Sequence, residues 1–364
     1  MEMQGESSNR KTDTRMGRNA VDVCAAFSHG ARMANEKRFG CLGILLTVVL
    51  CLSLLFNVLF VVGGVFGMTG NSLLLHEHPL TPPLSVGLKT KIAVIRLSGL
   101  ISNFGGGSIG ESMVEDIKIQ LDYAVQDQDV KAIVLAIDSP GGEVTASDII
   151  YNAVKAARTK KPIVVSMGST AASGGYYVAC GASYIVAHDT TFTGSIGVIM
   201  QTLNYSELFG KVGLEMVTFK SGKFKDMLSG SRVLGDEEKT YVQSLVMQTY
   251  SKFVGIVAEE RKLVEAELRS GVADGRVLSG KDAFTAKLID QVGDFEAAVK
   301  KAQELGQAPG AAVVRYQLPA NFGRYLSLLG KSEPPKKIEI QIAPTNGLNL
   351  QPGQLYLLPG IFAQ

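Results

Sequence analysis

The sequence lacks several of the features by which protein classes are recognised. Its 364 residues carry a formal net charge of only +2, which gives no electrostatic bias toward nucleic acid. No glycine-rich loop has the spacing of a P-loop or of the G-x-G-x-x-G fingerprint. The four cysteines form neither a disulfide framework nor, with histidine, a cluster with metal-ligand spacing. We therefore expect no nucleic-acid partner, no metal and no cofactor.

Histidine is also scarce, which limits the chemistry open to a catalytic serine. Of the four histidines, His29, His76 and His78 lie outside the expected folded domain, and only His188 lies inside it. A lone histidine at the end of a strand is more often structural than catalytic. A serine nucleophile would then need a lysine base, which must be desolvated or lie beside another cation to lose its proton. Cys180 fits a small buried residue better than a nucleophile.

One long apolar run is present near the N-terminus. Residues 42–68 contain no charged side chain, and at about 1.5 Å per residue a helix of this length exceeds the roughly 30 Å of bilayer hydrocarbon. The run is too long for a signal-peptide core, and no A-x-A cleavage site follows it. We predict a retained transmembrane helix over residues 41–68, in contact with membrane lipid, after a basic cytoplasmic tail over residues 1–40. The positive-inside rule puts everything after about residue 70 outside.

The rest of the chain has the pattern of an α/β domain. A linker over residues 69–90 is followed by a domain over residues 91–309, in which apolar strand-like runs alternate with helical periodicity. This alternation predicts a largely parallel sheet. The expected strands are 92–100, 132–137, 163–165 and 184–187, and the expected helices are 111–125, 145–158, 176–181 and one or two within 236–269. We expect residues 310–364, which hold six prolines, to form a loosely ordered tail.

The segment 161–182, KPIVVSMGSTAASGGYYVACGA, displays a serine. A β-branched run breaks into small residues around Ser173 and restarts as a helix, so a substrate backbone could approach closely. A helix start beside Ser173 would also favour a developing negative charge. The alternative is a glycine turn whose serine caps the helix.

A lysine base is available in residues 220–229, KSGKFKDMLS. Lys225 follows a phenylalanine in a partly apolar context, and Lys223 is the alternative two positions earlier. A solvated basic loop is the plainer interpretation of the same residues.

Two glycine motifs could complete a site. In DSPGGE (138–143), the N–H groups of Gly141 and Gly142, with that of Gly174, could bind an oxyanion. In TGSIGV (193–198), Ser195 could hold a neutral lysine, or simply form a turn.

Taken in order behind a single apolar span, DSPGG, STAASGGYY, TGSIGV and SGKFKD resemble the signal peptide peptidase A (protease IV) family of serine peptidases. The resemblance covers roughly residues 91–305. It implies a ClpP/crotonase-like fold with Ser173 as nucleophile, Lys225 as general base and Ser195 orienting the lysine. It further implies an oxyanion hole at Gly174 and the DSPGG glycines, with Gly141 ahead of Gly142.

Because each motif occurs once, the chain resembles the family's short form. That form implies a serine and lysine within one domain and a homo-oligomeric, dome-shaped ring. Expected substrates are cleaved signal peptides and other extended, membrane-associated peptides. The expected location is a bacterial inner membrane, with the catalytic domain periplasmic or extracytoplasmic; a thylakoid membrane is the alternative. Competing hypotheses are a crotonase-type acyl-CoA hydratase or isomerase, a non-enzymatic scaffold, and a peptidase specialised for a stomatin-like partner.

Overall fold

The computed structural model describes residues 45–58, 76–80, 89–103, 112–317 and 356–357. The chain forms two units, residues 1–74 and residues 75–364. In the first unit, residues 45–58 form a helix. The remainder of the predicted membrane segment, residues 41–44 and 59–68, lies outside the described residues. Within the described part of the chain, no helix is both long and apolar enough to cross a membrane.

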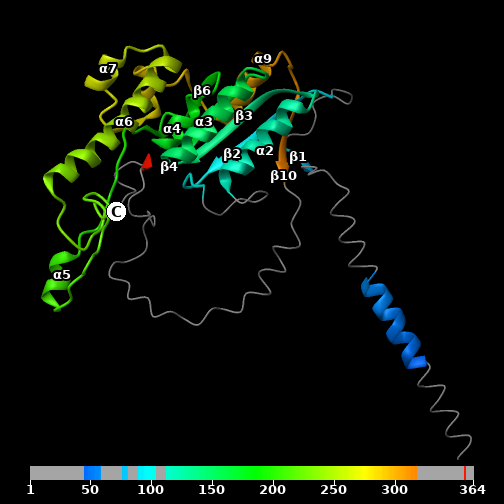
Figure 1. The fold of residues 1–364 in the computed structure, drawn as a ribbon. Helices are drawn as coiled ribbons and strands as arrows, with labels where there is room; N and C mark the ends of the chain where they lie inside the picture. Colours follow the sequence, from blue (N-terminus) through cyan, green and yellow to red (C-terminus); the bar gives the residue numbers. More distant parts are fainter. Residues whose placement is uncertain (1–44, 59–75, 81–88, 104–111, 318–355, 358–364) are drawn as a thin grey trace, which may run out of the picture. The chain divides into compact units, whose positions relative to one another are not determined.

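The second unit contains a mixed nine-stranded sheet whose main strand order is β1-β10-β2-β3-β5-β6-β9 (Figure 1). Pairing between neighbours is parallel from β10 through to β9, and β1 is antiparallel to β10. The end of β5 also pairs with β7, which pairs antiparallel with β8. The strands are β1 (His76–Pro79), β2 (Lys91–Ser98), β3 (Val130–Ser139), β5 (Ile163–Ala172), β6 (Tyr184–Ala187), β7 (Phe192–Gly194), β8 (Val277–Ser279), β9 (Gln291–Val292) and β10 (Ala312–Gln317).

Helices cover both faces of this sheet, as the alternation of its side chains requires. On β2, Ala93, Ile95 and Leu97 belong to the larger apolar core, with α2 (Met113–Gln126), α3 (Val144–Arg158) and α4 (Gly174–Ala179). Ile92 and Val94 point to the opposite face, where they pack with the alanines of α9 (Phe295–Leu305). Both faces of the central strands are therefore buried, which is typical of parallel sheets.

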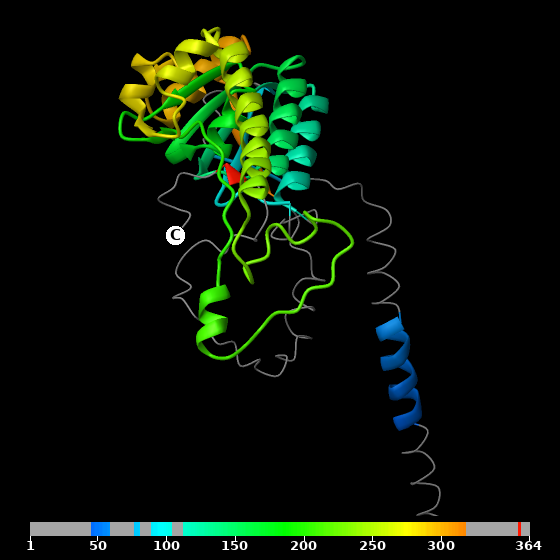
Figure 2. The same cartoon turned by 60° about the vertical axis from the view of Figure 1, so that its left-hand side comes forward.

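A long segment between β7 and β8 projects beyond this core. It contains α5 (Ser206–Lys211), α6 (Asp236–Arg261) and α7 (Glu265–Ser270), and α8 (Gly280–Thr285) follows β8. The second half of α6 packs on α4, where the Phe253 and Tyr177 ring centroids are 4.9 Å apart. Residues 201–235, here named the arm, bond in the described contacts only to themselves and to the first turns of α6. Figure 2 shows the arm as the long green loop beyond α6.

Two segments differ from the sequence-based expectation. The linker predicted over residues 69–90 contains β1, and the tail predicted over residues 310–364 contains β10 and β11 (Tyr356–Leu357). β10 extends the sheet because Val313 and Tyr316 are buried, and the Tyr316 ring meets Tyr123 edge-on at 5.0 Å. β11 forms a separate pair with β4 (Gly142–Glu143). The six prolines of the predicted tail lie outside the described residues.

Candidate active site around Ser173

Ser173 lies at the sharp junction between β5 and α4. Its backbone has φ 52° and ψ −113°, a conformation that costs a non-glycine residue about 1–3 kcal/mol. Its N–H donates to the Gly194 carbonyl oxygen at 2.8 Å. The side chain makes no capping hydrogen bond to α4, and its fully buried Oγ has no partner among the described residues. Ser173 therefore stands at the N-cap position of α4, but its side chain does not cap the helix.

The glycines predicted to form an oxyanion hole meet beside Ser173. A Cβ added to Gly174 would lie 3.1 Å from both the Gly141 Cα and the Gly142 amide nitrogen. One added to Gly141, where φ is +105°, would lie 2.6 Å from the Gly174 amide nitrogen. The backbones can approach this closely only because side chains are absent. The Gly141 N–H already donates to Ser139 Oγ at 3.1 Å, so among these amides it is the least suited to an oxyanion.

A second strand covers the same glycines. Tyr356 and Leu357 pair antiparallel with Glu143 and Gly142, and Leu357 is fully buried in the larger core. A Cβ on Gly141 would meet the Leu357 carbonyl oxygen at 1.9 Å, so this carbonyl lies directly against the glycine junction. Sequence analysis missed this strand. The only local signal is the short apolar run LYLL at residues 355–358.

Ser195 lies next to Ser173 through strand pairing. It follows Gly194, whose carbonyl accepts the Ser173 N–H, and its own N–H donates to the Arg276 carbonyl at 2.9 Å. Ser195 is buried and has φ 49°, again unusual for a residue other than glycine. The structure thus brings together Ser173, Ser195 and the three predicted glycines.

Lys225 is not among them. It lies on the exposed arm, and its amine has no hydrogen bond or ion pair among the described residues. No described contact joins the arm to α4 or β5, so a single chain does not bring Lys225 to Ser173. Lys223, the alternative base, forms an ion pair with Glu237.

An ion-pair network holds the turn that carries Lys225. Asp226 accepts hydrogen bonds from Arg232 at 2.7 Å and from Lys220 at 2.8 Å, and Arg232 also donates to Glu238 at 2.8 Å. The Arg232 guanidinium and the Gly235 N–H lower the pKa of Glu238 to about 2. Arg232 and Lys220 hold the pKa of Asp226 well below its usual range. The aspartate after Lys225 is therefore structural, a role that sequence analysis did not identify.

Other groups with possible chemistry are separate from this junction. Burial raises the pKa of the Cys180 thiol to about 12, as expected for a packing residue. The His188 imidazole is exposed and contacts Asp189 and Thr190. Across the described ranges, no group of three or more His, Cys, Asp and Glu side chains is arranged to hold a metal ion.

Comparison with known proteins identifies the family. The model of peptidase family S49 matches residues 155–308, and that of Clp protease matches residues 96–189. A Methanocaldococcus jannaschii relative named as a protease is 41% identical over 206 residues, which cover 56% of this chain and 66% of the relative.

Two further relatives carry more specific names. An Enterococcus faecium relative named as signal peptide peptidase SppA is 35% identical over 231 residues, 62% of this chain and 67% of the relative. Protease 4 of Salmonella typhi is 35% identical over 240 residues, 64% of this chain and 37% of the relative. With an S49 model across the Ser173 region and relatives of this similarity, the chain belongs to peptidase family S49, a family of serine proteases.

Proposed function

We propose that this protein is a serine endopeptidase that cleaves extended peptides through an acyl-enzyme. Ser173 is the nucleophile, Lys225 the general base, and Ser195 the residue that orients the lysine. Support comes from the strained backbone of Ser173, its buried hydroxyl without a partner, and the glycine amides packed beside it. Strain concentrated at one polar residue is typical of catalytic positions.

The observation that carries this proposal is the pairing of β11 with β4. An extended segment already lies antiparallel to Gly142 and Glu143, with a carbonyl against the glycine junction. Strand addition binds peptides through their main chain, while pockets select individual side chains. Leu357 is fully enclosed, and we propose that its place is the one that an apolar substrate side chain would take. The site therefore suits apolar, unfolded peptides such as cleaved signal peptides.

We propose that Lys225 acts on Ser173 of a neighbouring copy in a homo-oligomeric ring. Within the described residues of one chain, Ser173 has no base, while the arm presents an unpartnered lysine amine. The arm also exposes Leu203 (72%), Val217 (67%) and Phe219 (95%), an apolar surface that a second copy would bury. This proposal differs from the expectation that serine and lysine lie in one domain. Burial at such an interface would also desolvate Lys225, which favours its neutral form.

The proposed reaction begins when the neutral Lys225 amine takes the proton of Ser173 Oγ as this oxygen bonds to the peptide carbonyl carbon. The carbonyl oxygen becomes negative and accepts hydrogen bonds from the N–H groups of Gly174 and Gly142. The carbon–nitrogen bond then breaks, and the leaving amine receives the proton from the lysine. The Lys225 amine next deprotonates a water molecule, whose oxygen attacks the ester carbonyl carbon. The acyl group leaves as the carboxylic acid product, and the Lys225 proton returns to Ser173 Oγ.

We also propose that residues 41–68 anchor the protein in a bacterial inner membrane. The absence of charge in residues 42–68 and the basic residues before them support a single span with a cytoplasmic N-terminus. The catalytic domain would then be periplasmic or extracytoplasmic, close to the bilayer that holds cleaved signal peptides.

Complementation between inactive variants tests this proposal. Ser173→Ala and Lys225→Ala should each abolish hydrolysis of an apolar fluorogenic peptide, whereas Lys211→Ala, an exposed lysine on the same arm, should not. Coexpression of the two inactive variants should restore about a quarter of wild-type activity, because a mixed ring pairs an intact serine with an intact neighbouring lysine at that frequency. Full activity in either single variant would refute the dyad. No recovery in mixed rings would refute the base from a neighbouring copy.

A further inference from the structure

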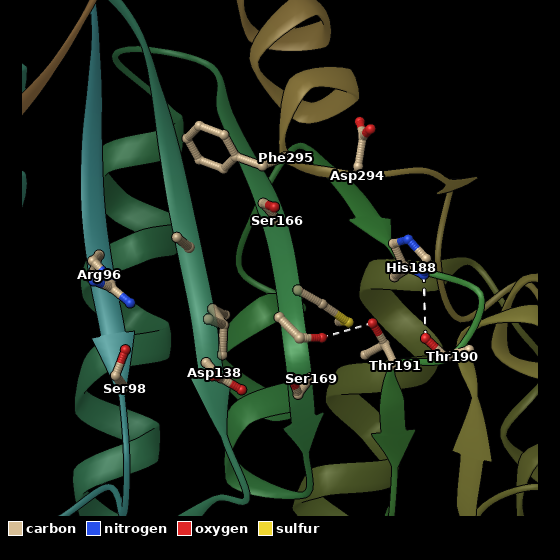
Figure 3. Close-up of a pocket in the computed structure, with 14 residues that line it drawn as sticks. Arg96, Ser98, Asp138, Ser166, Ser169, His188, Thr190, Thr191, Asp294 and Phe295 are labelled. Atoms are coloured by element: carbon tan, nitrogen blue, oxygen red, sulfur yellow. Dashed lines mark hydrogen bonds between the residues drawn. The ribbon is translucent and has the colours of Figure 1, made fainter. Parts of the chain in front are cut away.

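On the sheet face that α9 covers, the side chains of four neighbouring strands change from apolar to polar near the carboxyl ends of the strands. Along β2, the residues on this face run from Val94 to Arg96 and Ser98, and along β3 from Val134 to Ala136 and Asp138. On β5 and β6 the change comes at Ser166 and just past the strand end at His188. α9 begins at Phe295, so it does not extend over these polar residues. A cavity of about 460 Å³ lies over these polar residues (Figure 3). Its volume is in the usual range of small-molecule sites.

One side of this cavity is cationic. Arg96 forms no ion pair with a carboxylate among the described residues. Arg315 pairs with Val94 in the register of β10 and β2, so it shares the Arg96 face one strand away. The Arg315 Nε is buried without a hydrogen-bond partner in the described part of the chain. Burial and the Arg96 charge both lower the pKa of Arg315. Arg315 does not line the cavity itself, so the Arg96 guanidinium is the group that favours an anionic ligand at this end.

The other side is anionic. Figure 3 shows Arg96 and Ser98 along one side of the cavity and His188 and Asp294 along the other, with Asp138 and Ser166 between them. The Asp294 carboxylate caps α9 by accepting the Ala297 N–H at 2.9 Å, and Asp138 accepts the Thr170 N–H at 3.0 Å. The second carboxylate oxygen of Asp294 and that of Asp138 have no hydrogen-bond partner among the described residues.

The floor between the two sides is small and polar. The Ser166 side chain is 93% buried, because the residue is only 7% exposed, and no described residue hydrogen-bonds to its hydroxyl. Gly168 makes room for Asp138, since a Cβ there would lie 3.0 Å from the Asp138 side chain. The Phe295 ring adds an apolar wall. Across the strands, a ligand here meets the Arg96 cation, then the Asp138 carboxylate and the Ser166 hydroxyl, and at the far side the Asp294 carboxylate (Figure 3).

We propose that this cavity binds a short peptide with free ends, its carboxylate at Arg96 and its ammonium group at Asp294, while Asp138 between them accepts a hydrogen bond from the peptide N–H. Ser98 and Ser166 donate hydrogen bonds to the carboxylate and backbone, and Phe295 packs on a side chain. The site lies on the opposite face of the sheet from α4 and Ser173, so it is not part of the catalytic junction. The source of such peptides rests on the proposed function, because a peptidase releases short peptides with free ends.

Ligand-observed NMR titration of the full-length protein in detergent tests this proposal with the dipeptide Ala-Ala as probe. N-acetyl-Ala-Ala and Ala-Ala-amide each remove one terminal charge and should bind about tenfold more weakly, because a charge-assisted hydrogen bond is lost. Arg96→Gln should weaken Ala-Ala binding by a similar factor. Lys160→Gln, at the end of α3 on the other face, should not.

Several outcomes would overturn the proposal. These are no Ala-Ala binding, equal binding of the blocked dipeptides, equally strong competition by inorganic phosphate, or unchanged binding in Arg96→Gln. Ser166→Leu fills the floor and provides a second variant if Arg96→Gln does not fold. Ser173→Ala should bind Ala-Ala as the wild type does. A failed peptidase mechanism and a failed peptide site therefore give different results.

Discussion

Shortening the Leu357 side chain to alanine should open the proposed active site to peptide substrates. The Leu357 side chain is fully buried, and its strand occupies the edge of β4 that an extended substrate would use. Burial of a leucine contributes about 2 kcal/mol, so Leu357→Ala should lower the docking equilibrium of β11 about 30-fold. While β11 is docked on β4 it competes with substrate, so the apparent KM rises with the fraction of molecules in which β11 is docked.

We therefore expect Leu357→Ala to lower KM by up to about 30-fold while kcat stays unchanged. Initial rates with an apolar fluorogenic peptide measure both constants. Leu305→Ala is the matched control, because Leu305 is partly exposed at the end of α9 and touches neither β4 nor β11. An unchanged KM in a folded Leu357→Ala variant would show that β11 does not block substrate. A raised KM would show that Leu357 instead shapes the substrate's own pocket.

Three further predictions follow from single residues. Gly141→Ala should reduce kcat/KM at least 100-fold with the fold retained by circular dichroism, because the new Cβ would lie 2.6 Å from the Gly174 amide nitrogen and strain a φ of +105°. Although burial alone would raise the pKa of Glu260, hydrogen bonds from Arg158 and its neighbours lower it from 4.5 to about 2, so its stabilising effect is present above pH 4.5 and is lost as pH falls toward 2. Glu260→Gln should therefore destabilise the domain by about 1–2 kcal/mol at pH 7 in urea unfolding and by less at pH 3.5; an equal loss at both values would contradict this account. Cys180 should resist iodoacetamide at pH 8 until the protein unfolds, as followed by peptide mapping, because burial raises its pKa to about 12; rapid labelling of the native protein would show a thiol more open than the structure indicates.

Much of the fold follows from local sequence patterns. The strands expected at 92–100, 132–137, 163–165 and 184–187 correspond to β2, β3, β5 and β6, and the expected helices correspond to α2, α3, α4, α6 and α7. These elements were predictable because apolar periodicity and burial agree along each of them. β10 and β11 were not, because each is a short strand that gains its stability from partners far away in the chain.

The candidate site divides in the same way. The motifs around Ser173, Ser195 and the glycines were recognisable from residue types and spacing, and the structure brings these residues together. The position of Lys225 was not predictable from its motif, because an arm that bonds only to itself and to α6 is placed by whatever it packs against. The cavity at Arg96 was likewise not predictable from the sequence, because it forms only where polar residues of four separate strands lie side by side in the sheet.

The amino-acid sequence by itself therefore determined the α/β elements, the serine displayed between strand and helix, and the absence of a histidine base. Short-range periodicity and the conformational freedom of glycine suffice for these features. Only the tertiary structure decided that the Ser173 side chain does not cap α4, that a distant C-terminal strand covers the glycine junction, and that Lys225 lies apart from it. Each of these depends on contacts between residues far apart in the chain, which local patterns do not encode.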